Sequence, residues 1–280
     1  MEITILDAFA LPFMARALAT ISVLAVAAGI VGIGVSFRGL EFVSDGIVHA
    51  VFPGLVIGSL LGGAIGMLPA ATLAALAAAA LFTLLERRGG SDTAIAVVLT
   101  GLFSLGVVLV SRQESYVTQL QELLFGRLLT VTADQLWQIV AIAAVAVVIM
   151  ILTGRAQLYR AFDPAGFAAA GHRSLATDLA LAAATALLTV AGVQALGVLM
   201  VVALLTIPMA IARLLTRRFA LLIPLAIVAP LLAGVVGLWW SFAWSVTTDS
   251  SVSAGAIVVL VLVGAYLLAV GYRLLVKGKR

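Results

Sequence analysis

The sequence predicts an all-α, polytopic integral membrane protein with eight or nine transmembrane helices. Of its 280 residues, 64% are hydrophobic and only 10% are charged, whereas soluble domains carry about 25% charged residues. Apolar runs long enough to cross a bilayer, about 17–25 residues each, recur along the whole chain. The absence of cysteine excludes disulfides, thiolate metal sites and cysteine nucleophiles. We expect residues 1–280 to form a single transmembrane domain.

The number of spans depends on two places where apolar stretches almost touch. Only Met67, Leu68 and Pro69 mark the join between the second and third stretches, and Leu196 alone separates the sixth from the seventh. Eight spans with one partial or re-entrant segment are therefore compatible with the sequence, as are nine. The candidate stretches are 17–37, 46–66, 67–85, 93–111, 134–153, 175–195, 197–214, 219–243 and 254–275.

The distribution of basic residues predicts the orientation, because cytoplasmic loops carry an excess of Lys and Arg. With the N-terminus outside, only Arg16, Arg112 and Arg127 fall on the outer side, and the C-terminus is cytoplasmic. This pattern also accounts for a net charge of +4 without nucleic acid as a partner. The inner residues are Arg38, Arg87, Arg88, Arg155, Arg160, Arg173, Arg213, Arg217, Arg218, Arg273, Lys277, Lys279 and Arg280.

The stretch Ser44–Gly54 places a carboxylate and an imidazole four residues apart, at Asp45 and His49. On a helix, this spacing puts both groups on one face. Ionisable groups are costly in a bilayer, so the pair is expected to face protein or water. Carboxylate oxygen and imidazole nitrogen together suit a divalent metal in the manganese-to-zinc range. Two alternatives remain: Asp45 as a helix N-cap, and His49 as a hydrogen-bonded packing residue.

The same span carries glycine every fourth residue, at Gly54, Gly58, Gly62 and Gly66. Such a stripe of small residues lets a second helix approach closely. At 100° per residue, the stripe lies about opposite the polar pair, so one face is expected to pack while the other presents Asp45.

Segment 112–133 is too polar to span. We expect it outside, as an interfacial helix or a solvated loop.

Residues 162–171 predict a short helix within an inner loop. Asp163 is suited to the N-cap, Pro164 to the first helical position and Gly171 to the position after the C-cap. A connector between spans needs only a few residues, so a capped helix here indicates either a docking element for a cytoplasmic subunit or a helix lying on the membrane surface.

The sequence lacks the motifs of several classes of enzyme. There is no Gly-x-x-x-x-Gly-Lys-Ser/Thr phosphate loop for ATP, and no His-Glu-x-x-His or Gly-x-Ser-x-Gly. Acids placed to relay protons are sparse, with Asp45 the main one and Asp178 near the inner end of its span. The sequence therefore indicates neither an enzyme nor an ATPase.

Four motifs follow one another in the order of a known family. Arg38 with Ser44–Gly54 resembles an Arg…Gly-Asp-Ala-x-Ser-His-x-x-Leu-Pro-Gly signature, although Ser44, Val48 and Phe52 replace its Gly, Ser and Leu. Leu124–Gly126 resembles its Leu-Phe-Gly segment, Phe162–Gly171 its cytoplasmic coupling loop, and Leu199–Arg213 its Val-Ala-Leu-Leu-x-x-Pro-Ala block. Together they resemble the permease subunits of bacterial manganese, zinc and iron ABC importers.

The resemblance implies a type II ABC importer permease-like bundle in the bacterial cytoplasmic membrane, surrounded by lipid. It implies a homodimer working with cytoplasmic ATPase subunits and an extracytoplasmic metal-binding protein, with no permanently bound cofactor. Zinc or manganese is the implied substrate, and Asp45 and His49 would contact the ion transiently along its path. The positions matching the coupling loop are Phe162, Asp163, Pro164, Ala168, Ala169 and Gly171.

Two other functions are weighed against this one. An ABC permease for a metal chelate, such as a siderophore or cobalamin, needs a wide pore rather than ligands. A secondary transporter works without an ATPase.

Overall fold

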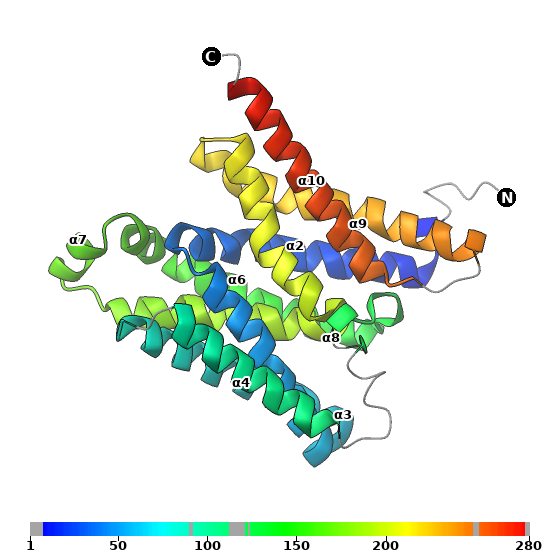
Figure 1. Cartoon of the computed structure of the whole chain (residues 1–280), viewed down its shortest axis with the longest axis horizontal. Coiled ribbons are helices and arrows are strands. Elements are labelled where there is room, and N and C mark those ends of the chain that lie inside the picture. The colour runs from blue at the N-terminus through cyan, green and yellow to red at the C-terminus, as the bar shows by residue number, and fades with distance from the viewer. Residues whose placement is uncertain (1–7, 90–91, 112–120, 123, 249–251, 278–280) are drawn as a thin grey trace.

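The computed structural model describes residues 8–89, 92–111, 121–122, 124–248 and 252–277, and within these ranges it contains helices and no strand (Figure 1). The predicted all-α class is confirmed. The elements are α2 (Pro12–Arg38), α3 (Glu41–Arg87), α4 (Asp92–Val110), the 3-10 turn η1 (Leu128–Thr130), α6 (Ala133–Phe162), α7 (Pro164–Ala169), α8 (Ser174–Leu215), α9 (Phe219–Thr248) and α10 (Ala254–Lys277).

Among the described residues, eight helical segments are long and apolar enough to cross a membrane. They are α2, the two halves of α3, α4, α6, α8, α9 and α10. At 42 residues, α8 is about twice the length that one span needs. Its backbone leaves helical geometry at Gly197, with φ 78° and ψ 163°, between the two stretches that almost touch in sequence. This break explains why the sequence alone is compatible with eight or nine spans.

Helix α3 is a hairpin of two antiparallel halves. The reversal is at Gly63, with φ 56° and ψ −145°, whereas Pro53 and Pro69 both lie within helical backbone. A Cβ atom added to Gly54 would meet Ala74, and one added to Gly58 would meet the backbone of Gly66. The absence of side chains at these positions lets the two halves lie in close contact.

The buried centre of the bundle is formed by α2, the first half of α3 and α8. Ile21 and Leu24 of α2 pack there with Leu181 and Leu196 of α8 in one apolar cluster. Helices α4, α6, α9 and α10 surround this centre with few fully buried residues, and their exposed side chains include many large apolar ones. The helix that carries Asp45 therefore belongs to the interior of the chain.

The polar segment 112–133 is described only in part, because residues 112–120 and 123 lie outside the described ranges. Its last residues form η1 and then the N-terminus of α6, where Thr132 and Gln135 exchange hydrogen bonds between side chain and backbone. This reciprocal capping stabilises the N-terminus of α6. At its other end, α6 continues to Phe162, nine residues past the span expected to end at 153.

Candidate functional site

Asp45 and His49 lie together on the first half of α3, as their spacing predicts. The His49 Nε2 atom is 3.4 Å from the Asp45 Oδ1 atom. The side chain of His49 is 22% exposed and that of Asp45 is 32% exposed, so both are reachable from outside the chain. The imidazole and the carboxylate thus form one small polar surface on an otherwise apolar helix.

The structure excludes Asp45 as an N-cap. Helix α3 begins at Glu41 and its N-cap is Leu40, so Asp45 lies in the second turn and its carboxylate projects from the side of the helix. The helix therefore begins five residues before the apolar stretch 46–66. The polar side chain of Ser44 is accommodated in this turn by donating its hydroxyl to the Leu40 carbonyl.

Aromatic rings from α3 and α4 hold the imidazole of His49 in place. The Phe103 ring meets His49 edge-on, with ring centroids 5.3 Å apart, and Phe103 packs against Phe52 at 5.6 Å. The Nδ1 atom of His49 is buried without a hydrogen-bond partner. The Nε2 atom faces Asp45, so a packing role for His49 would give a partner to one ring nitrogen and leave the buried Nδ1 atom without one.

The substituted positions of the stretch Ser44–Gly54 are buried. Val48 is completely buried and Phe52 almost so. The Phe52 ring occupies the space that a side chain at Gly106 of α4 would need. Phe52 thus shapes the packing between α3 and α4, and Val48 belongs to the apolar core, so neither lies on the exposed polar surface of Asp45 and His49.

One chain supplies only part of a metal coordination sphere at this place. Within the described ranges, no group of three or more His, Cys, Asp or Glu side chains is placed to hold a metal ion. Structural and catalytic metals take three or four protein ligands. The pair alone is therefore suited to a weak or transient contact, or to a site completed by another chain.

The predicted glycine stripe divides in the structure. Gly54, Gly58 and Gly66 lie at the contact between the two halves of α3, whereas a Cβ atom at Gly62 would meet nothing within 4 Å. The close packing is therefore within one chain. Gly62 follows the stripe in sequence, but it lies one residue before the reversal at Gly63, where the two halves no longer pack.

Helix α7 forms as the sequence predicts, between the ends of α6 and α8. The Asp163 carboxylate accepts a hydrogen bond from the Gly166 N–H at 2.8 Å, Pro164 is the first helical residue, and Gly171 has φ 76°. Phe167 is buried, stacked on His172 and edge-on to Tyr159. This one aromatic anchor leaves the rest of the short helix outside the bundle, at the left end of Figure 1.

The residues expected to take part in coupling are exposed around that anchor. Phe162 is 66% exposed and its ring lies 5.4 Å from that of Phe37, at the end of α2. The small side chains present a nearly flat surface because they project little beyond the backbone. The exposed members of the set are Phe162, Asp163, Pro164, Ala168, Ala169 and Gly171.

A cluster of charges near α7 was not predicted from the sequence. Asp178, in the second turn of α8, is 5% exposed. Its carboxylate is 2.7 Å from an Arg38 guanidinium nitrogen, 2.8 Å from one of Arg87 and 3.4 Å from one of Arg160. The only sequence signal was a single acid near the inner end of a span, with arginines at the ends of other spans on the same side.

Three guanidinium groups surround the Asp178 carboxylate, and guanidinium groups stay positively charged in proteins. They repel a divalent cation, so the Asp178 cluster is not suited to bind a metal ion.

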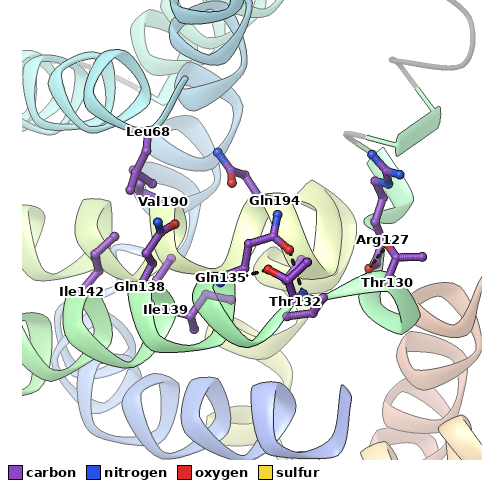
Figure 2. A pocket seen from close by; sticks show the side chains of 13 residues that line it. Leu68, Arg127, Thr130, Thr132, Gln135, Gln138, Ile139, Ile142, Val190 and Gln194 are labelled. Atoms are coloured by element: carbon purple, nitrogen blue, oxygen red, sulfur yellow. Dashed lines mark hydrogen bonds between the residues drawn. The ribbon is translucent and has the colours of Figure 1, made fainter. Parts of the chain in front are cut away.

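A cavity lined by both polar and apolar side chains lies at the opposite end of α6. It has a volume of about 200 Å³, and Figure 2 shows Gln135, Gln138 and Gln194 around it, with Arg127 at its edge. Its lining contains amide and hydroxyl groups but neither a carboxylate nor an imidazole. It shares no residue with the Asp45 and His49 surface.

Comparison with known proteins places the chain in a family. The family described as "ABC 3 transport family" matches residues 10–273. The chain is 30% identical over 269 residues to "Manganese transport system membrane protein MntC" of Listeria monocytogenes, covering 96% of this chain and 95% of that protein. It is 31% identical over 238 residues to "Chelated iron transport system membrane protein YfeD" of Yersinia pestis, covering 84% and 79%.

A solved structure has the same architecture over nearly the whole length. The structure titled "PsaBC from Streptococcus pneumoniae in complex with Fab" aligns with a TM-score of 0.82 and 26% identity, covering 96% of this chain and 95% of that one. Sequence and fold therefore agree over the same residues, and the eight apolar helices are those of a multi-pass membrane protein. The chain belongs to the ABC 3 transport family.

Proposed function

We propose that this chain is the membrane-spanning permease subunit of an ATP-binding-cassette importer that carries divalent metal ions, manganese or zinc, into the cytoplasm. The observation that carries the proposal is the pair of Asp45 and His49, 3.4 Å apart on a membrane-spanning helix and partly exposed. Family membership and the transport systems named for its relatives support it.

The ion passes between two copies of the chain. A twofold axis beside the first half of α3 brings together two carboxylates and two imidazoles, which is a sufficient set for tetrahedral or octahedral coordination. The partial exposure of both side chains and the lack of a third ligand in the described part of one chain support this arrangement. Sharing the ligands between copies also keeps the site weak when they separate, as conduction requires.

The energy comes from ATP hydrolysed by a partner. The exposed face of α7, around Ala168 and Ala169, is the docking surface for a cytoplasmic ATPase subunit. Its burial of Phe167 supports this role, because the anchor makes a six-residue helix a firm element through which force can pass. An extracytoplasmic metal-binding protein delivers the ion at the other side.

The chain lies in the bacterial cytoplasmic membrane with its N-terminus outside and its C-terminus inside, and in this arrangement α8 crosses the membrane twice, turning back at Gly197. Hydrogen bonds from Arg213, near the end of α8, to Ser36, near the end of α2, support this return. The basic residues support this orientation: Arg38, Arg87 and Arg160 gather on the side of α7, and an excess of arginine indicates the cytoplasmic side.

Metal uptake by cells that express single variants tests the ion path. Asp45→Asn and His49→Gln each remove one ligand with little change in volume, and we expect either to lower manganese and zinc uptake at least about tenfold, the equivalent of about 1.4 kcal/mol. Asp134→Asn is the control, since Asp134 is an exposed acid in the first turn of α6. Normal uptake by both variants at normal expression contradicts the ion path.

Two further uptake experiments distinguish the proposed function from a chelate permease and from a secondary transporter. Uptake of free metal that is unaffected by excess siderophore or cobalamin favours the ion over a chelate. Uptake that continues without any ATPase identifies a secondary transporter and contradicts the proposal.

Co-purification of the ATPase tests docking. Ala168→Trp places a bulky ring at an exposed position of α7 and leaves the buried Phe167 itself unchanged, and we expect it to abolish ATPase association. Ala133→Trp, at the exposed start of α6, is the matched control. Equal recovery of ATPase with both variants contradicts docking at α7.

A further inference from the structure

The ion-pair cluster at Asp178 joins helix ends that are far apart in the sequence. Arg38 is the last residue of α2, Arg87 is the last residue of α3, and Arg160 is in the last turn of α6. All three converge on one carboxylate near the start of α8. A single buried side chain therefore connects four elements at the end of the bundle where α7 lies.

Side chains of this cluster contact both ends of the segment that carries α7. Arg160 precedes α7 by four residues, and Ser174, which accepts a hydrogen bond from Arg87, is the first residue of α8 after it. Gln157 adds a third link, because its side-chain amide donates to the Thr177 carbonyl at 2.8 Å. A displacement of α7 thus pulls directly on the surroundings of Asp178.

The cluster is equally close to the helix that carries the proposed ion contacts. Gly39, with φ 66°, makes the turn between Arg38 and α3, and Asp45 follows seven residues after Arg38. Asp178, Glu86 and Ser44 line one small cavity with the Arg38 side chain. Ser44 is the neighbour of Asp45, so the space beside Asp178 borders the turn of α3 that carries the proposed ion contact.

The charges favour a cluster that moves as a unit. Asp178 and Arg38 are 4% and 8% exposed at their side chains, and separating such a pair leaves a buried charge without compensation. The ends of the four helices therefore stay linked when one of them is displaced, which is the property that a conformational relay needs.

We propose that Asp178 is the positioning residue that transmits movement of α7 to the Asp45 and His49 turn of α3. The inference rests on the proposed function, since it takes α7 as the place where the ATPase acts. Asp178 does not contact the ion. It keeps the ends of α2, α3 and α6 attached to α8, so that ATP-driven displacement of the α7 segment reorients α3 instead of being absorbed in the loops.

The test measures manganese ions imported per ATP hydrolysed, in liposomes that contain the permease with its ATPase and receive manganese from its binding protein. Asp178→Asn keeps the shape of the side chain but removes the charge. We expect normal ATPase association and continued ATP hydrolysis, with the ion-to-ATP ratio lowered at least about fivefold, within the usual range of coupling between sites. Asp178→Glu, which restores the charge, recovers part of the ratio.

The matched control is Asp92→Asn, an exposed acid in the first turn of α4. A purely structural role for Asp178 reduces the amount of folded complex but leaves the ratio equal to that of the control, and this result overturns the proposal. If Asp178→Asn yields no folded complex, Arg87→Gln decides by the same ratio, because the Arg87 side chain is 34% exposed and tolerates replacement.

The outcome is separable from that of the proposed function. Failure of docking at α7 is seen as unchanged ATPase recovery with Ala168→Trp, whereas failure of the relay is seen as an unchanged ion-to-ATP ratio with Asp178→Asn.

Discussion

Gly126 and Gly197 cross backbone against backbone. A Cβ atom on either residue would overlap the main chain of the other, and the Arg127 N–H donates to the Ala195 carbonyl at 3.0 Å beside the crossing. Gly197 has φ 78° and ψ 163°, a region that only glycine occupies readily. The Leu124–Gly126 segment thus packs against the backbone of α8 at the break near Gly197.

Replacing Gly197 with Ala is expected to destabilise the protein by more than the about 1–3 kcal/mol of backbone strain alone, because the new methyl group also overlaps Gly126. The measurement is the thermal unfolding midpoint of the purified protein in detergent. Gly264→Ala is the matched control: Gly264 is a helical glycine of α10 with open space around it. Equal midpoints for the two variants contradict the crossing.

The break in α8 illustrates what the sequence reveals and what it omits. Hydropathy identified the two apolar stretches on either side of Gly197, because apolar side chains at helical spacing are a local property. It did not show where the second helix turns. That depends on Gly126, 71 residues earlier in the chain, and no local pattern records such a contact.

The Asp45 and His49 pair and the caps of α7 could be predicted for the same reason. Each depends on residues within one turn of helix, namely a spacing of four or a capping position. The Asp178 cluster depends on arginines from three distant helix ends, so the sequence showed its members without their association. Charge counting assigned those arginines to topology alone, and the structure gives three of them a common partner.

The contact between Phe52 and Gly106 predicts a compensating pair of substitutions. Gly106→Ala places a methyl group against the Phe52 ring and the Pro53 nitrogen, and overpacking of this kind costs about 1–3 kcal/mol. Phe52→Leu alone leaves a cavity beside Gly106. We expect the double variant to be more stable than the sum of the two single effects, since each change relieves the other.

The unfolding midpoints of the natural chain, the two single variants and the double variant give the coupling between the substitutions at Phe52 and Gly106. Strict additivity shows that Phe52 and Gly106 do not share one space. Manganese uptake provides a second readout, because Phe52 holds Phe103 and Phe103 holds the His49 ring.

The Asp163 cap predicts a local effect on ATPase docking. Asp163→Ala removes the acceptor for the Gly166 N–H, which costs about 1 kcal/mol of helix stability, and six residues have little other support. We expect weaker ATPase co-purification with no change in the unfolding midpoint of the bundle. Asp163→Asn and Asp163→Ser retain a capping oxygen and restore docking, whereas failure of both to do so assigns the loss to charge instead of capping.

A cross-link between identical positions tests whether the Asp45 surfaces of two copies face one another. The natural chain has no cysteine, so Asp45→Cys introduces the only thiol and any covalent dimer is joined at that residue. Two side chains that bind one ion across a twofold axis are within reach of a short bismaleimide, and we expect a dimer band on denaturing gels. The reaction is carried out with a metal chelator present, because the introduced thiolate beside His49 is itself a ligand for zinc and a bound ion would protect it from the maleimide. Asp134→Cys, exposed at the start of α6, is expected to remain monomeric with the same reagent.

Efficient modification of Asp45→Cys by a monofunctional maleimide without any cross-link places the two surfaces apart. The ion would then have to be held by one carboxylate and one imidazole alone.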